Sequence, residues 1–216
     1  MKHLFVLALL ISCSFVSRAQ EQNAQPLRPH AVFLGNSITQ NWSNFHPDFF
    51  RQNNFVGKGI GGEVTSQMLT RFRTDVLELQ PCVVVILAGT NDIAQNQGYV
   101  THRQIMDNIA SMADLARFHN IRVILCSVLP AENYRWRSEE FNREVLPCQA
   151  IQRLNQMIRQ YALDNDCEYV DFWTPMSDGK GAMKEGLSSD GVHPHPHAYS
   201  IMEELVAPVI SRLCGQ

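Results

Sequence analysis

Apolar runs that suit buried strands alternate along this chain with segments whose apolar residues recur at helical spacing. The clearest run is 82–88, where five branched apolar residues follow one another, as expected for a parallel strand buried on both faces. Other apolar runs predict strands at 31–34, 54–57, 121–128 and 168–172.

Helical spacing marks the segments between these runs. Ile105, Ile109, Met112 and Leu115 fall on one side of a helix that precedes the fourth strand. Pro147 suits the first turn of the next helix, and the last helix is predicted over 198–213. The residues expected to face the sheet from these two helices are Ile151, Leu154, Ile158 and Tyr161, and then Tyr199, Met202, Leu205, Val206, Val209 and Ile210.

The alternation of strand and helix predicts parallel strands joined by right-handed crossovers, with helices on both faces. The expected fold is an α/β fold, a three-layer α/β/α sandwich around a five-stranded parallel sheet. With 216 residues, 45% of them hydrophobic, the chain can bury one sizeable core, so we expect one domain over 31–216. The formal net charge of −3 and the lack of a Lys/Arg-rich run argue against nucleic acid as a partner.

Residues 1–19 have the features of a signal peptide. Lys2 precedes an apolar segment at 4–16, and Ser17-Arg18-Ala19 forms a cleavage site of the small-x-small type. The apolar segment is shorter than the ~20 residues of a membrane-spanning helix, and no later stretch of the sequence approaches that length. The Gln-rich residues 20–30 predict a disordered lead-in. The sequence therefore predicts an exported protein, periplasmic or extracellular.

A second interpretation of the same region concerns Cys13. The run Leu10-Ile11-Ser12-Cys13 resembles a bacterial lipobox, in which Cys13 would be lipidated and become the new N-terminus. The exported protein would then be a lipoprotein anchored through Cys13.

Five of the six cysteines remain if the leader is removed, so at least one thiol stays free. Cys82 and Cys126 border or occupy apolar runs and suit small core residues. Cys148 and Cys167 lie at opposite ends of one predicted helix, too far apart to form a disulfide. Cys167 and Cys214 both fall at the lower edge of the predicted sheet, which leaves a Cys167–Cys214 disulfide as the pairing to test.

Four segments carry the candidate chemistry, and each follows a predicted strand or precedes the last helix. Ser37 comes soon after the first strand, Gly62 after the second, Asn91 after the third, and Asp190 and His193 precede the last helix. A doubly wound sheet gathers the carboxyl ends of its strands at one edge, so we expect these residues to converge. Ser37 taken alone is weak evidence for a nucleophile, because a serine after a strand is commonly a helix N-cap.

The chain resembles the SGNH hydrolases, also called GDSL-type esterases and lipases, in four blocks that occur in the family's order. The blocks are Gly35-Asn36-Ser37-Ile38-Thr39, Gly59-Ile60-Gly61-Gly62-Glu63, Gly89-Thr90-Asn91-Asp92 and Asp190-Gly191-Val192-His193-Pro194. Asn36 departs from the Asp usual in the first block and Ala198 from a glycine common after the last. Neither position has a catalytic role in the family.

The resemblance implies a flavodoxin-like fold and an esterase that uses no cofactor. In such an esterase Ser37 is the nucleophile, His193 the base and Asp190 the partner of the base. The resemblance also implies an oxyanion hole formed by Ser37, Gly62 and Asn91.

The chemistry of these residue types agrees with the implied roles. A serine hydroxyl attacks an ester when a base takes its proton, and a neutral imidazole, with a pKa near ~6.5, does this around neutral pH. Asp190, three residues before His193, can accept the other imidazole N–H and fix the tautomer.

Other interpretations stay open at this point. His193, His195 and His197 alternate, and with Asp190 and Asp92 they have the residue types of a zinc site. The prolines between these histidines restrict that geometry, so we expect a site without metal. A lipase or lysophospholipase of the same family would act on longer acyl groups, and a non-catalytic relative would keep the pocket for binding carbohydrate.

Tyr134, Arg135, Trp136 and Arg137 follow the fourth strand at the same sheet edge. They either line a substrate pocket or form a surface loop with one buried Trp. Aromatic rings flanked by Arg suit a sugar face with its hydroxyl or acid groups. The sequence therefore predicts hydrolysis of short-chain acyl esters, acetyl above all, on small molecules or carbohydrates. It leaves open the natural ester, the acyl length and the oligomeric state.

Overall fold

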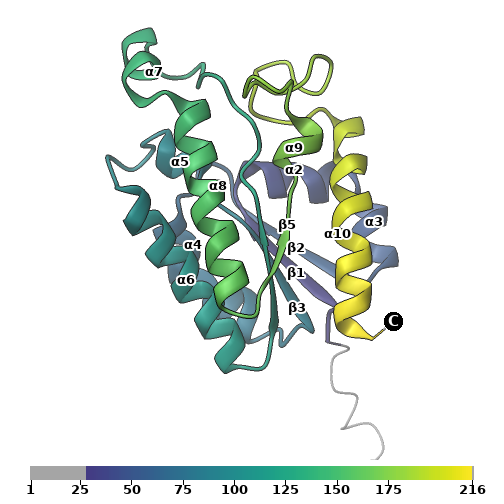
Figure 1. Cartoon of the computed structure of the whole chain (residues 1–216). Helices are drawn as coiled ribbons and strands as arrows, with labels where there is room; N and C mark the ends of the chain where they lie inside the picture. The colour runs from purple at the N-terminus through teal and green to yellow at the C-terminus, as the bar shows by residue number, and fades with distance from the viewer. Residues whose placement is uncertain (1–27, 216) are drawn as a thin grey trace, which may run out of the picture.

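The structure is a computed structural model that describes residues 28–215 (Figure 1). The predicted signal peptide, the lipobox with Cys13 and most of the predicted lead-in lie outside these residues. The described part has the predicted three-layer architecture, with five parallel strands in the order β2-β1-β3-β4-β5. This is the flavodoxin-like strand order, and it confirms the fold class expected from the sequence.

The sheet is buried on both faces along its inner strands. β1 and β3 pair in parallel from Ala31 with Val83 to Gly35 with Leu87, and every residue of both strands is buried. Successive side chains point to opposite faces, so continuous burial requires helices on each side. The five strands are β1 (Ala31–Gly35), β2 (Phe55–Gly59), β3 (Val83–Leu87), β4 (Arg122–Cys126) and β5 (Glu168–Val170).

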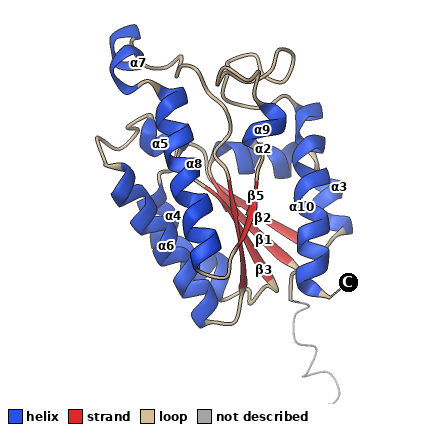
Figure 2. Ribbon diagram, viewed as in Figure 1, coloured by secondary structure: helices blue, strands red, loops and turns tan. Residues whose placement is uncertain are grey.

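Two layers of helices cover the sheet, as Figure 2 shows. Helices α4, α6 and α8 pack on one face, and α2, α3 and α10 pack on the other. No helix within residues 28–215 combines the length and apolar character needed to cross a membrane. The helical elements are α2 (Ser37–Phe45), α3 (Pro47–Gln52), α4 (Thr65–Phe72), the π-helix η1 (Arg73–Leu77), α5 (Thr90–Ile93), α6 (His102–Phe118), α7 (Glu139–Val145), α8 (Pro147–Asp164), α9 (Trp173–Met176), the 3₁₀-helix η2 (Pro196–Ala198) and α10 (Tyr199–Cys214).

Two leucines predicted to lie on the apolar side of their helices are not buried with the rest of that side. Leu115 and Leu205 are 37% and 36% exposed, whereas the next residues, Ala116 and Val206, are fully buried. Each leucine lies one position off the buried stripe, about 100° around a helix with 3.6 residues per turn.

Helix α7 falls outside the sequence prediction. It begins after Ser138, whose hydroxyl accepts the Phe141 N–H at 3.1 Å, and none of its residues is buried. Phe141 and Val145 of α7 are partly buried and pack against the core, but two apolar positions in a seven-residue helix make too short a pattern to predict it. α7 lies beyond the carboxyl ends of the strands in Figure 1.

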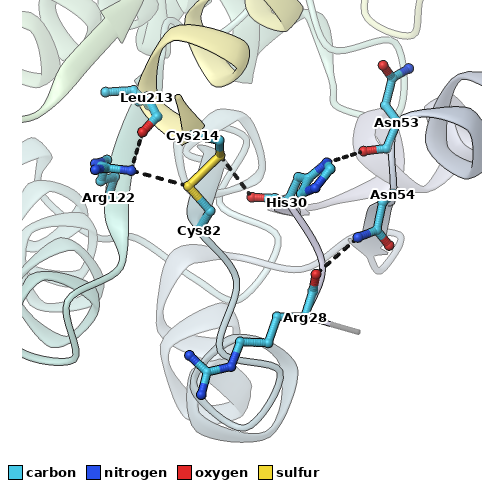
Figure 3. The surroundings of a disulfide bond; sticks show 8 residues. All are labelled: Arg28, His30, Asn53, Asn54, Cys82, Arg122, Leu213 and Cys214. Carbon is cyan, nitrogen blue, oxygen red and sulfur yellow. Dashed lines mark hydrogen bonds between the residues drawn. A yellow bond between two sulfur atoms is a disulfide. The ribbon is translucent and has the colours of Figure 1, made fainter. Parts of the chain in front are cut away.

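The predicted Cys167–Cys214 disulfide is wrong, because Cys214 is bonded to Cys82 (Figure 3). Cys82 lies just before β3, with its Cα 6.0 Å from that of Cys214 at the end of α10. α10 packs against β3, so its last residue reaches the start of that inner strand. The pairing also corrects the prediction of Cys82 as a simple core residue; Cys126, Cys148 and Cys167 are free.

Candidate active site

Ser37 is the first residue of α2, directly beyond the end of β1. Asn36 is the N-cap of this helix, since its side-chain oxygen accepts the Ile38 N–H at 2.9 Å. The capping role that Ser37 could have filled therefore belongs to Asn36, and the Ser37 hydroxyl is free for another partner. The glycine at position 35 lets the end of β1 lie close to the first turn of α2 and to β3. A Cβ at Gly35 would collide with the side chain of Thr39 and the carbonyl of Leu87.

In the structure, a chain of side-chain hydrogen bonds links Ser37, His193 and Asp190. Ser37 Oγ lies 2.9 Å from His193 Nε2, and His193 Nδ1 lies 2.7 Å from Asp190 Oδ2. In this arrangement the imidazole can take a proton from the serine hydroxyl while its other nitrogen donates to the carboxylate. A serine hydrolase can use this arrangement to activate its nucleophile.

The loop that carries Asp190 is built around its carboxylate. Asp190 Oδ1 accepts the backbone N–H groups of Val192 and His193 at 2.9 and 2.8 Å and the Ser188 hydroxyl at 3.0 Å. Burial raises the pKa of Asp190, but the hydrogen bonds from His193 and Val192 outweigh this effect and hold the pKa well below its usual range. The carboxylate therefore stays ionised beside the imidazole. Ser188, which the sequence analysis missed, also accepts the Gly191 N–H at 2.9 Å.

A glycine turn lies next to Ser37. The Glu63 N–H donates to the Ile60 carbonyl at 3.4 Å, and Gly62, the third residue of this turn, has a φ of 79°. A positive φ there is typical of a type II turn, which requires glycine and leaves the N–H of its third residue out of the turn hydrogen bond. A Cβ at Gly61 would lie 3.9 Å from Ser37 Cβ, so the turn approaches the serine closely.

Asn91 joins this turn to the end of β3. Its Nδ2 donates to the Glu63 carbonyl at 2.9 Å, and the residue is buried. The bond uses one of the two amide hydrogens of Asn91 and fixes the orientation of the amide. Ser37, as the first residue of a helix, has a backbone N–H without an intrahelical partner. The three predicted oxyanion-hole residues therefore lie on neighbouring segments, with the glycine turn next to Ser37 and bonded to Asn91.

Arg71 of α4 ties these loops together and was missed by the sequence analysis. Its Nε donates to Glu63 Oε2 at 2.7 Å, its Nη1 to Asp75 Oδ2 at 2.6 Å, and its Nη2 to the Gly35 carbonyl at 3.0 Å. Burial raises the pKa of Asp75, but bonds from Arg71 and Lys58 hold it below its usual range. The i,i+4 spacing of Arg71 and Asp75 was the one signal available in the sequence.

The predicted substrate-binding segment divides into a buried and an exposed part. Tyr134 is fully buried, its hydroxyl lies 3.0 Å from Thr90 Oγ1, and burial raises its pKa. Tyr134 is therefore a core residue and does not line the site, and the buried aromatic residue of the segment is not the Trp. Trp136 is 44% exposed, with its ring 6.3 Å from that of His193. Arg135 donates to the Ser189 carbonyl at 2.8 Å.

The histidines of the alternative metal site point to different partners. His193 contacts Ser37 and Asp190, while the rings of His195 and His197 stack on each other with centroids 5.9 Å apart. Within residues 28–215 no group of three or more His, Cys, Asp or Glu side chains could hold a metal ion.

A flavodoxin-like parallel sheet with a hydrogen-bonded serine, histidine and aspartate at its carboxyl edge has the architecture of an SGNH-type hydrolase. The model of the GDSL-like lipase/acylhydrolase family matches residues 33–201. The chain therefore belongs to this family, as its four sequence blocks predicted, and it is a carboxylic ester hydrolase.

Several known proteins are similar to this chain. A GDSL-like lipase from Bacteroides thetaiotaomicron has 42% sequence identity and a TM-score of 0.81, over 92% of this chain and 97% of that one. Esterase TesA of Pseudomonas aeruginosa is 26% identical over 158 residues, which are 73% of this chain and 70% of the relative. The uncharacterized lipoprotein YqeF of Bacillus subtilis is 26% identical over 221 residues, or 89% and 88% of the two chains.

Proposed function

We propose that this protein is an exported serine esterase that removes short acyl groups, acetyl above all, from carbohydrates. The observation that carries the proposal is the row of hydrogen bonds from Ser37 Oγ through the His193 imidazole to the Asp190 carboxylate.

In the proposed reaction, Ser37 Oγ attacks the ester carbonyl while His193 Nε2 takes its proton. Asp190 accepts the Nδ1–H and stabilises the imidazolium that forms. The tetrahedral intermediate then expels the alcohol, which takes the proton from His193 and leaves an acyl group on Ser37. Water, deprotonated by the same imidazole, attacks this acyl-enzyme, and the acid leaves as the serine hydroxyl is restored.

The negative oxygen of the tetrahedral intermediate needs hydrogen-bond donors that are already in place. The backbone N–H groups of Ser37 and Gly62 and the Asn91 amide are the proposed donors. The removal of one such donor raises the barrier by ~2.7–4 kcal/mol in other hydrolases.

Two features support a short acyl group carried on a sugar. The exposed ring of Trp136 lies beside His193, where it can cover one face of a sugar bonded to the reacting ester. The neighbouring Arg135 is a polar group at the point where a long alkyl chain would need apolar contacts.

Export is supported by the Cys82–Cys214 disulfide, since such bonds persist in oxidising compartments outside the cytoplasm. The signal-peptide features of residues 1–19 agree with export, and similarity to a lipoprotein agrees with anchoring through Cys13.

The test is hydrolysis of nitrophenyl acetate by the wild type, Ser37→Ala and Ser43→Ala. Ser37→Ala should lower kcat by roughly 10³-fold or more, with an unchanged circular dichroism spectrum. Ser43 lies in the same helix and its hydroxyl donates to the Gln40 carbonyl at 3.0 Å, away from the catalytic residues, so its alanine variant is the matched control. Near-wild-type turnover by Ser37→Ala would refute the mechanism.

A nitrophenyl ester series from acetyl to octanoyl then tests the acyl length. We expect the acetyl ester to have the highest kcat/KM. Faster hydrolysis of octanoyl than of acetyl esters would identify a lipase-type enzyme, and wild-type protein that binds glycans without hydrolysing any ester would be a binding protein.

A further inference from the structure

A groove of about 1040 Å³ lies beyond the carboxyl ends of the strands, the edge of the sheet at which Ser37 also lies. It is lined by the segment between β4 and α7, by α7, by the first turns of α8 and by Lys180. Figure 1 shows α7 and the loop after α9, which contains Lys180, rising beyond the carboxyl ends of the strands.

The lining of this groove is basic although the whole chain is acidic. Four basic side chains, Arg135, Arg137, Arg143 and Lys180, face two acidic ones, an excess of two positive charges in a protein with a formal net charge of −3. Arg143 pairs with Glu139, one of the two acids, at 3.5 Å. In the part of the chain that the structure describes, Arg135, Arg137 and Lys180 form no ion pair.

Neutral partners hold the two arginines in place. Arg137 Nη2 donates to Asn96 Oδ1 at 3.3 Å, and its guanidinium carbon lies 5.3 Å from the centroid of the Phe141 ring. Arg135 Nη1 donates to the carbonyl of Ser189. These contacts orient the guanidinium groups but leave their charges uncompensated, which is the state in which an arginine binds a carboxylate of a ligand.

The groove begins beside the proposed catalytic residues. Ser189, which accepts the Arg135 hydrogen bond, directly precedes Asp190. Trp136 stands between Arg135 and Arg137 in the sequence, and its ring is the one that approaches His193. A chain of sugars with its ester at Ser37 can therefore extend along the groove.

We propose that the groove binds carboxylate groups of the substrate, so that the preferred substrate is an acetylated glycan that carries uronic acids. The inference rests on the proposed esterase function and adds a charge requirement to it. Arg135, Arg137 and Lys180 supply the positive charges, and the amide side chains of the lining bond the sugar hydroxyls.

The experiment compares kcat/KM for acetylated xylo-oligosaccharides of equal length, with and without a glucuronic acid branch. For the wild type at low salt, we expect the acidic substrate to be preferred by roughly fivefold, the effect of two or three weak charge pairs. Sodium chloride at ~1 M shortens the Debye length to about 3 Å, so the ratio should fall toward one.

Variants assign the preference to the groove. Arg135→Gln combined with Lys180→Gln should abolish most of it. The matched control is Arg51→Gln combined with Arg103→Gln, which removes the same charge from exposed arginines paired with Asp48 and Asp107. The control should keep the wild-type ratio. Thermal melts establish that the variants fold, and Lys180→Gln alone, in an exposed loop, carries the test if the double variant does not.

The outcomes separate this inference from the proposed function. Equal rates on both glycans at low salt, or an equal loss of preference in the control variant, would overturn the groove proposal and leave the esterase intact. If the wild type also fails to hydrolyse nitrophenyl acetate, the proposed function fails, and this inference fails with it.

Discussion

The loss of the Cys82–Cys214 disulfide should destabilise the protein by a large share of its free energy of unfolding. The two cysteines are separated by 132 positions, so the bond closes a loop that contains three of the five strands. In the chain-entropy model, a crosslink over a loop of this length restricts the unfolded chain by about 5 kcal/mol at 25 °C. Measured effects of native disulfides are mostly 2–5 kcal/mol, against total stabilities of ~5–15 kcal/mol.

One native contact beside the disulfide involves no sulfur atom, although Arg122 Nη1 also lies 3.3 Å from Cys82 Sγ. Arg122 donates a hydrogen bond to the Leu213 carbonyl, and this bond holds the end of α10 against the start of β4 (Figure 3). The Cys82→Ala/Cys214→Ala variant keeps this contact, so it should fold to the same structure. The predicted loss therefore arises mainly from the greater freedom of the unfolded chain.

The assay is urea unfolding followed by circular dichroism, with and without a thiol reductant. The oxidised wild type should unfold at a higher urea concentration than the double variant, and reductant should lower the wild-type midpoint to that of the variant. Reductant should not affect the double variant, and Cys148→Ala, which removes a free thiol, is the control for thiol loss. Equal midpoints for the oxidised wild type and the double variant would refute the reasoning.

Three further predictions concern charged groups near the candidate site. Arg71→Met should lower kcat roughly tenfold with little change in KM, because the glycine turn beside Glu63 loses the hydrogen bond that holds it. Arg71→Lys should recover part of the loss. An unchanged kcat in Arg71→Met would exclude the positioning role. The pKa of Asp190 lies well below its usual range, so its carboxylate should stay ionised on the acid side of the kcat/KM profile, which should fall with a slope of one. A slope of two would show that this carboxyl group titrates as well. Burial raises the pKa of Asp92 to about 6, so the folded state binds its proton more tightly than the unfolded state. Relative to Asp92→Asn, the wild type should therefore gain about 2 kcal/mol of stability as pH falls from ~7 to ~4 and lose it as pH rises through ~6; a difference that stays constant with pH would refute the raised pKa.

The sheet could be predicted from the sequence because its strands are buried on both faces. Val83–Leu87 has five branched apolar residues in succession, and the shortness and β-branching of this run favour a buried strand over a buried helix. α7 could not be predicted in the same way, because this seven-residue helix has no fully buried residue and packs Phe141 and Val145 against the core only in part. Its one local signal was Ser138 followed by Glu139 and Glu140, an N-cap with acidic residues in the first turn.

The same distinction applies to contacts between distant segments. Asp190 and His193 could be paired from the sequence because they share one loop. The sequence placed any buried ring of this segment at the Trp, whereas Tyr134 is the buried one, because the partner of its hydroxyl is Thr90, 44 positions earlier. The disulfide failed for a similar reason, since its pairing depends on which strand the last residue of α10 reaches.

The proposed catalytic geometry depends on a helix that supplies no catalytic residue. Arg71 of α4 bonds the Gly35 carbonyl, two positions before Ser37, and the Glu63 carboxylate, one position after Gly62. Only 14% of its side chain is exposed, so the loss of Arg71 would leave nearby carboxylates partly buried without their main partner. The hydrogen bonds of Arg71 therefore keep the two loops in one relative position before any substrate binds. Hydrogen-bond donors fixed in advance stabilise a developing negative charge without a cost of rearrangement, which is what an oxyanion hole requires.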